Sequence, residues 1–581
     1  MSGKSGFSQM PHDRVERQDD AARPHRLGGR WKACVRILSC ALGLMLVHGA
    51  TALADAPLGS VYVPLDSWVY PALDRLAGLG VIDKQIVGLR PWTRLQCAEL
   101  VQDADDNLVS ADSEDEEAME LYAALSAEFS VELKALDGRT ARQAGVESLY
   151  TRALGIAGTP LRDGYNFGQT LWNDFGRPYN TGFNNVSGFS AQAAGGRFFA
   201  YIRGEYQYSP AYAGLAASQQ AFVAQLDGTP VAPFSQAAGA VSHFDLLDTY
   251  VGVRLWGFDV AAGKQSLWWG PGTMGGMLFS DNSDPLPMVK INQVEPMVLP
   301  GFLRYLGPIR VQAFFARTLG NEYPRGPYVH GEKIMFKPTR NWEFGLSRTT
   351  EAFGQGVPLT LRNLFSTYFS VSSVFGALNP QSFPGKRQGG IDYSYRVPHL
   401  RKWVTSYGDF FSEDDVNPFV NPSRSMYNPG LYVSQLPHLE KFDFRFEVAN
   451  THHHEEAYTS FFYKEDYTNK GFLFGNAVGR RGSAFDISST YWLSPRKRIQ
   501  VGWREHKVAS SLIPSGGSQN AVRVQADWLV RQEFEFSLLA QHELWVFPFL
   551  AARPQSNDVI SIQITDYPRK LWSRSALKTP D

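Results

Sequence analysis

Runs of alternating apolar and polar side chains, spread over residues 146–567, limit the possible folds more than any other feature. One run reads, in order, Ile560, Ser561, Ile562, Gln563, Ile564, Thr565. Comparable runs lie at 198–205, 251–256, 309–313, 443–448, 499–504 and 522–528. Successive side chains of a β-strand point to opposite faces, so each run predicts a strand with one apolar and one polar face.

A membrane barrel explains these runs better than a soluble sandwich, whose strands also alternate. The predicted strands, of about ten residues each, match the length at which a tilted strand crosses a bilayer. Aromatic residues make up 13% of the chain and charged residues only 19%, which suits a large surface facing something other than water. No apolar run long enough for a spanning helix follows residue 50. A closed barrel is the other structure that satisfies every backbone polar group in lipid.

The polar faces of the predicted strands then line the lumen of a wide barrel. The length of the alternating region predicts about 16 to 18 strands, too many for wall side chains alone to fill the interior. The polar residues expected to face the lumen are Arg203, Glu205, Arg254, Arg310, Arg445, Glu447, Arg504, Arg523 and Asp527. They are most simply cross-strand ion pairs, such as Arg203/Glu205 and Arg445/Glu447. The alternative is a polar surface for polysaccharide or for a plug.

Residues 1–54 predict an export signal. Basic residues precede an apolar core at 37–47, and Ala52-Leu53-Ala54 is a small-x-small cleavage pattern. Export places the mature protein outside the cytoplasm. Removal of this segment takes away two cysteines and leaves Cys97, which we expect to be a buried thiol without a disulfide partner.

Residues 55–140 predict a small helical region that plugs or caps the barrel, or forms a separate bundle. Asp66 or Ser67 is expected to cap a first helix that ends at Gly80. Thr93-Arg94-Leu95-Gln96 is a capping-box pattern that opens a second helix. A third is expected to begin with a similar pattern at Ser113 and to run to Leu136. Residues 568–581 are left as a C-terminal tail.

Long connections between the strands are predicted at 209–244, 270–308, 351–389 and 409–441. Sugar binding needs aromatic rings for the C–H face of a pyranose and polar side chains for its hydroxyl groups. Five residues near the second connection supply both kinds and are the candidate polysaccharide site: Trp268, Trp269, Asp281, Asn282 and Asp284. The alternative for the two tryptophans is packing against the wall or membership of an interfacial aromatic belt.

Several other clusters are better explained as ordinary surface. His452-His453-His454-Glu455-Glu456 suggests a metal, but a solvated hairpin tip is the simpler interpretation. Glu413, Asp414 and Asp415 are too close in sequence to face each other across a glycosidic bond. No Gly-x-Ser-x-Gly, His-Glu-x-x-His or phosphate-loop motif occurs, so we expect neither an enzyme nor a cofactor or metal. A net charge of −1 provides no basic field for nucleic acid.

The chain resembles the Wzi-type capsule-assembly outer-membrane proteins over about residues 61–567. The resemblance is carried mainly by Gly263-Lys264-Gln265, Trp268-Trp269-Gly270-Pro271, Ser280-Asp281-Asn282, Pro285-Leu286-Pro287 and Leu306-Gly307-Pro308. The chain departs from the family pattern in its long leader, in residues 219–240 and in its continuation past Tyr567.

This resemblance implies an all-β transmembrane barrel of about 18 antiparallel strands, closed below by N-terminal helices. It also implies a lectin that helps attach capsular or extracellular polysaccharide to the cell. The expected location is the outer membrane of a Gram-negative-type bacterium, and the expected partners are polysaccharide, outer-membrane lipid and the barrel-assembly machinery. A diffusion or uptake channel and a surface polysaccharide-modifying enzyme are the alternatives.

Overall fold

The computed structural model describes residues 58–568, except 111–114, 138–141, 370–384, 414–424, 453–456 and 532. The predicted export signal at 1–54 and nearly all of the tail at 568–581 lie outside the described residues. The same holds for Asp414, Asp415 and the His453–Glu456 part of the histidine cluster. The barrel and the N-terminal helices belong to one compact unit, residues 56–581.

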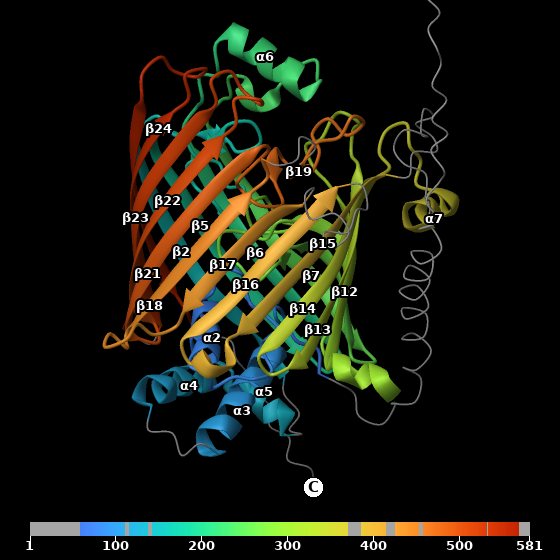
Figure 1. Ribbon diagram of the computed structural model, residues 1–581, viewed down its shortest axis with the longest axis vertical. Helices are drawn as coiled ribbons and strands as arrows, with labels where there is room; N and C mark the ends of the chain where they lie inside the picture. Colours follow the sequence, from blue (N-terminus) through green and yellow to red (C-terminus); the bar gives the residue numbers. More distant parts are fainter. Residues whose placement is uncertain are drawn as a thin grey trace, which may run out of the picture. The chain divides into compact units, whose positions relative to one another are not determined.

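Eighteen antiparallel strands form a closed barrel in which each strand pairs with its neighbours in sequence order and β25 closes the ring against β2 (Figure 1). This confirms the predicted fold class. The strands are β2 (Arg142–Gly158), β5 (Gly182–Gly195), β6 (Phe198–Ser209), β7 (Val241–Leu255), β8 (Phe258–Gln265), β10 (Leu286–Gln293), β12 (Pro308–Arg317), β13 (Tyr328–Thr339), β14 (Trp342–Ala352), β15 (Lys386–Arg396), β16 (Val404–Glu413), β17 (Met426–Val433), β18 (Phe442–Asn450), β21 (Gly482–Ser494), β22 (Lys497–Val508), β23 (Gly517–Arg531), β24 (Phe534–Val546) and β25 (Gln555–Asp566).

Burial along the strands follows the two-residue period of the sequence. On β25, Ile560, Ile562 and Ile564 are exposed on the outer face, whereas Ser561 and Thr565 are buried. On β6, Phe198 and Ile202 are exposed while residues 199, 201 and 203, on the other face, are buried. The apolar face of the alternation therefore points outward and the polar face points inward.

The two ends of the barrel differ in the length of their connections. Tight turns join β5 to β6, β7 to β8 and β21 to β22 at one end, and the long connections lie at the other. Two of the predicted long connections are wrong in extent, because the range 270–308 contains β10 and the range 409–441 contains β17. Pro287 and Pro429 lie within these strands, and proline is so unusual inside a sheet that it favours a loop prediction.

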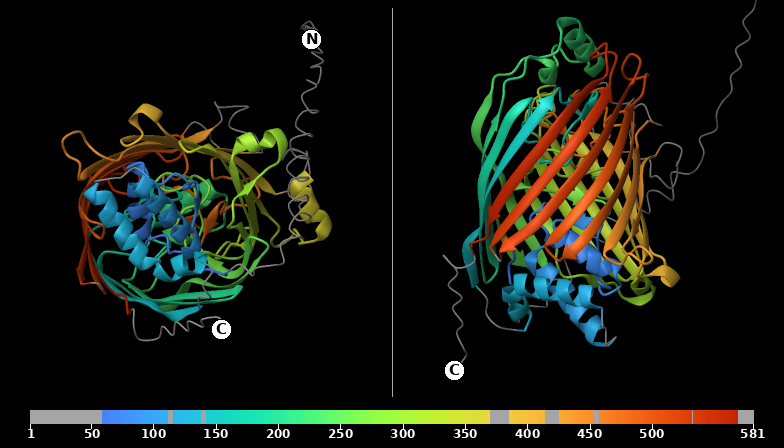
Figure 2. Two further views of the ribbon diagram at one scale, coloured as in Figure 1. Left: turned by 90° about the horizontal axis from the view of Figure 1, so that it is seen from below. Right: turned by 90° about the vertical axis from the view of Figure 1, so that its left-hand side faces the viewer.

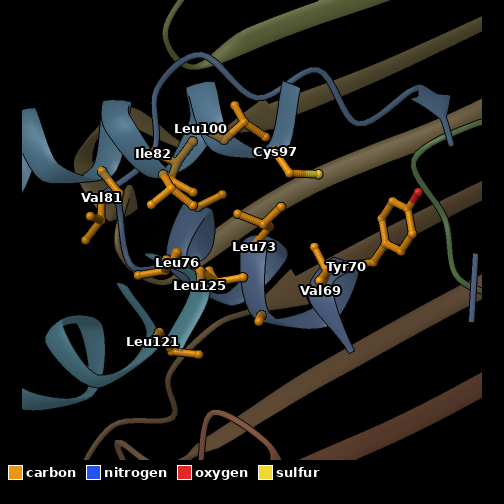
Figure 3. Packing of buried hydrophobic residues seen from close by; sticks show 14 of the residues in the cluster. Val69, Tyr70, Leu73, Leu76, Val81, Ile82, Cys97, Leu100, Leu121 and Leu125 are labelled. Carbon is orange, nitrogen blue, oxygen red and sulfur yellow. The ribbon is translucent and has the colours of Figure 1, made fainter. Parts of the chain in front are cut away.

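The helical N-terminal region packs at the tight-turn end (Figures 1 and 2). It comprises α2 (Val69–Gly78), α3 (Arg94–Ser110), α4 (Glu116–Glu128) and α5 (Ser130–Leu136). Figure 3 shows the apolar residues of α2 facing those of α3 and α4. None of the described helices is long and apolar enough to cross a bilayer. Cys97 of α3 is buried and unpaired, as predicted, and burial raises the pKa of its thiol.

The capping predictions were only partly correct. In the α3 box, the Thr93 N–H donates to Oε1 of Gln96 (3.0 Å) and the Gln96 N–H donates to Oγ1 of Thr93 (3.1 Å). This confirms the predicted capping box. For α2, Trp68 occupies the N-cap position without a capping side chain, and Oγ of the preceding Ser67 accepts from the Val69 N–H (3.3 Å). Asp66, the other predicted cap, instead forms an ion pair with Arg203.

The expected third helix is divided in two. The N-cap of α4 is Asp115, whose side chain accepts from the Ala118 N–H, and Ser113 lies outside the described residues. Phe129 ends α4 and precedes α5, and its ring is fully buried. The bend at Phe129 lets both short helices pack on α3.

Replacing Thr93 with Ala should destabilise the start of α3 by about 1 kcal/mol, because it removes the side-chain acceptor of the box. Hydrogen exchange at the amides of residues 94–97 measures this loss. Ser110→Ala at the exposed far end of the same helix is the control. Equal exchange rates at 94–97 in both variants would contradict the stabilising role of the box.

Candidate functional site

Three of the long connections fold back into the barrel instead of extending away from it. They are residues 159–181, 266–285 and 451–481, the last of these described without 453–456. Their buried residues join inward-facing residues of the wall in one hydrophobic cluster: Tyr165, Leu267, Trp269, Met277, Leu278, Phe279, Ala457, Tyr458, Tyr467, Leu473 and Phe474, with Phe314, Met335, Phe411 and Met426 of the strands. The core of the molecule therefore lies inside the barrel.

Aromatic packing gives this core its order. The rings of Phe279 and Phe474 stack with centroids 5.4 Å apart. Trp269 meets Phe279 edge-on at 5.0 Å and Phe314 at 5.5 Å. The indole N–H of Trp269 donates to Oε1 of Gln312 on β12 (2.8 Å). A tryptophan buried in this way has its polar atom satisfied and both ring faces in contact.

The N-terminal region and one inward loop meet in a small sheet within the barrel. Residues 89–90 form β1 (Leu89–Arg90), which pairs antiparallel with β9 (Trp268–Trp269). The Gly270 N–H adds a hydrogen bond to the Gly88 carbonyl (3.0 Å). The Trp-Trp-Gly-Pro sequence therefore holds the N-terminal region and the 266–285 loop together.

All five residues of the predicted polysaccharide site are buried. Trp268 and Trp269 are 8% and 1% exposed. Asn282 accepts from Gln169 and donates through Nδ2 to the Leu473 carbonyl (3.0 Å). Burial and then the negative charge of Asp66 raise the pKa of Asp281 well above its usual range.

The burial of the two tryptophans agrees with the alternative that they pack inside the barrel. A long run rich in Gly, Pro, Asn and Asp predicts a loop, but it does not say whether the loop leaves the barrel or enters it. Here the partners of the run are β1 and the inward face of β12, which are far away in sequence. Of the five residues, Asp284 alone lines the larger pocket described below.

Several of the predicted lumen residues form ion pairs inside the barrel, but not always with the expected partner. Arg203 forms two hydrogen bonds to Asp66, at 2.9 and 2.7 Å. Glu205 accepts two from Arg177, at 2.8 and 2.5 Å, and lies 3.5 Å from Arg203 on its own strand. The remaining pairs are Arg254 with Asp259, Arg523 with Asp486 and Asp527 with Arg498.

Other predicted lumen residues hold the inward segments in place. Glu447 accepts from the backbone N–H groups of Thr273 (2.7 Å) and Met274 (2.6 Å). Arg504 lies 4.1 Å from the ring centroid of Trp172 in another inward loop. The predicted Arg445/Glu447 pair does not form: Arg445 lies over the Tyr432 ring, at 4.2 Å. Arg310 donates to the Gln293 carbonyl at 3.4 Å.

A pocket of about 440 Å³ opens at the long-connection end of the barrel. It is bounded by β7, by the inward loops and by the connection that carries α6 (Ala217–Asp227), which stands at this end in Figure 1. Its aromatic lining includes Phe175, Tyr179, Phe234 and Phe472, and the last two meet edge-on at 5.8 Å. The rings of Phe234 and Phe472 are half-buried and provide apolar contact area next to charged groups.

Two aspartates and two lysines form four ion pairs at this pocket, and one further cation lines it. Asp284 lies 2.7 Å from Nζ of Lys264 and 2.8 Å from Nζ of Lys470. Asp245 pairs with the same two lysines, at 3.3 and 2.8 Å. Burial raises the pKa of Asp284, against the opposing effect of the lysines.

The further cation is Arg162 of β3 (Arg162–Asp163). Its guanidinium lies 4.4 Å from the centroid of the Tyr212 ring. Among the described residues, no carboxylate forms a salt bridge with Arg162. The guanidinium is therefore available to hydroxyl or carboxylate groups of a ligand in the pocket.

Sequence reasoning missed most of the pocket and, apart from the predicted hairpin tip at His452–Glu456, the 451–481 loop. The pocket draws Arg162, His243, Lys470 and Phe472 from three separate segments, and none of these segments contains a recognisable motif. A signal for the loop was present in the dense mixture of Tyr, Phe, Asn and Gly between 458 and 479, which is typical of a packed and ordered connection.

Comparisons with known proteins agree with this architecture. A family model described as capsule assembly protein Wzi matches residues 153–559, more than half of the chain. An uncharacterized 55.8 kDa protein in the cps region of Klebsiella pneumoniae is 26% identical over 196 residues, covering 33% of this chain. The match spans 37% of that relative, little more than a third of its length.

The similarity to a solved structure covers more of the chain. That structure is of Wzi, an outer-membrane protein involved in group 1 capsule assembly in Escherichia coli and described as a carbohydrate-binding β-barrel. It has a TM-score of 0.64 and 17% identity, and the match covers 88% of this chain and 100% of that one. At this level of identity the similarity establishes the fold.

Trp269→Ala should destabilise the folded barrel by about 3 to 5 kcal/mol, because it leaves a cavity beside Phe279 and Phe314 and removes the donor to Oε1 of Gln312. The midpoint of heat-induced unfolding, followed on a gel, measures the change. Trp256→Ala, at an exposed turn, is the matched control and should unfold close to the parent. Unchanged unfolding of the Trp269 variant would contradict its assignment to the core.

Proposed function

Because this chain belongs to the capsule assembly protein Wzi family, we propose that it is an outer-membrane barrel that binds capsular or extracellular polysaccharide and helps attach it to the cell surface. The exposed apolar face of the strands would then contact outer-membrane lipid, after insertion by the barrel-assembly machinery. The long-connection end, with its pocket, would face the exterior and the N-terminal helices would face the periplasm.

The filled interior supports a binding role over a transport role. The N-terminal region and three inward loops share one hydrophobic cluster with the wall, and Lys333 and Lys337 of β13 donate to backbone carbonyls of residues 88 and 85 (2.6 Å each). A solute crossing such a barrel would have to displace these contacts. The diffusion-channel alternative requires a continuous polar path, which this packing does not favour.

The single observation that carries the proposal is the 440 Å³ pocket at the outer end. Phe472 and Phe234 offer half-buried rings for the apolar face of a sugar. Arg162, Lys470 and Asp245 offer donors and acceptors for its hydroxyl groups. Each sugar residue would bind weakly, and retention would come from repeated binding along the polymer.

The arrangement of the pocket carboxylates favours binding over catalysis. Glycoside hydrolysis uses two carboxyl groups that face each other across the scissile bond. Asp245 and Asp284 instead share the two lysines Lys264 and Lys470, and Asp284 is buried behind them. We therefore propose that these carboxylates hold the shape of the pocket.

The double variant Arg162→Gln/Phe472→Ala should weaken binding of the host's purified polysaccharide by about tenfold, the equivalent of roughly 1.4 kcal/mol of lost contact. Binding to immobilised polymer measures the affinity, and the amount of polysaccharide retained on cells measures the consequence. Phe461→Ala, an exposed ring in the same part of the 451–481 loop but outside the pocket, is the control.

Equal affinity in the double variant and the Phe461 control would reject this pocket as the binding site. Fragmentation of the polymer during incubation with the parent protein would reject the proposal of binding without catalysis and would favour the surface-enzyme alternative.

In planar bilayers the intact protein should show no steady conductance, because the interior is packed with protein. Removing residues 58–137 should produce intermittent or steady conductance by opening the periplasmic end. A large, stable conductance in the intact protein would support the diffusion-channel alternative.

A further inference from the structure

A short helix lies on the outside of the barrel wall, separate from the pocket and the interior. This is α7 (Leu361–Phe369), in the connection that follows β14. In Figures 1 and 2 it lies beside the wall, outside the ring of strands, toward the long-connection end. A helix in this place has two neighbours, the wall on one side and the surroundings of the barrel on the other.

The wall under α7 carries polar groups on its outward face. On β13, Lys333 and Met335 point into the barrel, where Lys333 forms an ion pair with Asp392 (2.7 Å). Because side chains alternate, His330 and Glu332 point outward. Arg348 of β14 pairs in register with Glu332 and shares that face.

The inner face of α7 covers this polar patch and satisfies it. Oγ1 of Thr367 lies 3.0 Å from Nε2 of His330, and the Tyr368 hydroxyl donates to Glu332 (2.7 Å). Nη2 of Arg348 donates to the Thr367 carbonyl (2.6 Å). His330 is left fully buried. In this way α7 pairs the outward-facing polar groups and shields them from the surroundings of the barrel.

The exposed side of α7 carries a stripe of apolar residues beside the exposed Arg362. Leu361, Phe365 and Phe369 are 76%, 61% and 52% exposed, and their spacing of four residues forms one stripe along the helix. The Phe365 and Phe369 rings stack with centroids 6.2 Å apart. In water, three large apolar side chains side by side on so short a helix would be unfavourable.

Nearer the tight-turn end, the outer face of the wall is apolar and continuous with this stripe. There the outward face of β13 and β14 carries cross-strand apolar pairs, Ile334 with Leu346 and Phe336 with Phe344. The apolar outer face of the strands is therefore interrupted by the His330/Glu332/Arg348 patch, and α7 restores an apolar surface over the interruption.

We propose that α7 is an interfacial helix whose Leu361/Phe365/Phe369 stripe inserts among the acyl chains of the outer leaflet. Burying a polar or charged wall face in lipid is costly, and α7 replaces that face with an apolar one. Short amphipathic helices bind at the boundary between headgroups and acyl chains in this way. The inference rests on the proposed outer-membrane location and concerns only this part of the wall.

The test places single cysteines on the Cys97→Ser protein, labels them with an environment-sensitive fluorophore and inserts each protein into phosphatidylcholine vesicles. Phe365→Cys probes the stripe, and Leu361→Cys is a second probe should the first fail to fold. Ser366→Cys is the control on the same helix, because adjacent helical residues point about 100° apart. Ile562→Cys on the outer face of β25 reports on membrane insertion of the barrel itself.

We expect a spin-labelled lipid to quench the probes at 365 and 562, and aqueous iodide to quench the probe at 366. Quenching at 562 without quenching at 365 or 361 would overturn the role of α7 and leave the barrel location intact. Absence of lipid quenching at 562 as well would instead reject the outer-membrane location. Protection of residue 365 from both quenchers, with cross-linking between copies, would overturn the lipid assignment in favour of a second copy of the chain.

Discussion

The width of the barrel is the constraint on which the rest of the structure depends. Closing eighteen strands into a ring gives the backbone N–H and C=O groups of every strand a partner strand on both sides. It also leaves an interior that wall side chains alone cannot fill. This chain fills it with its own N-terminal region and three returning loops, so that its largest aromatic cluster lies at the centre. The hydrophobic effect that usually assembles a soluble core here acts inside a membrane-type wall.

Charged residues on the inner face of the wall form hydrogen bonds that hold the N-terminal region and the returning loops in place. Arg203 reaches Asp66 in the N-terminal region, and Glu447 accepts from the backbone of the 266–285 loop. Such pairs offset the cost of burying charge by making several short, directed hydrogen bonds. They also fix the position of each segment, which apolar contacts alone would specify less sharply.

The parts of the fold that were predictable from sequence are those determined by local periodicity. Alternation identified the wall, and Thr93 with Gln96 identified the start of α3, because both patterns depend on neighbours within a few residues. The direction of the loop after Trp269 was not predictable, since its partners Leu89 and Gln312 lie about 180 and 43 residues away. The strands β10 and β17 were not predicted, because each contains a proline, which favours a loop prediction.

The candidate pocket shows the same limit. Asp284 stood out because it follows other polar residues in a loop, but Arg162, His243 and Lys470 gain meaning only when the tertiary fold places them around one cavity. No period or motif connects these residues in the sequence.

The contacts of the N-terminal region also bear on the order in which the protein assembles. This region is the first described part of the chain, yet its hydrogen bonds reach β6 through Asp66, β13 through Gly88, β15 through Ile82 and the segment beyond β17 through Arg75. These positions are gathered around one axis only when the intervening strands have paired. Complete docking of the N-terminal region must therefore occur late in assembly. It requires that the ring has already closed in the correct register.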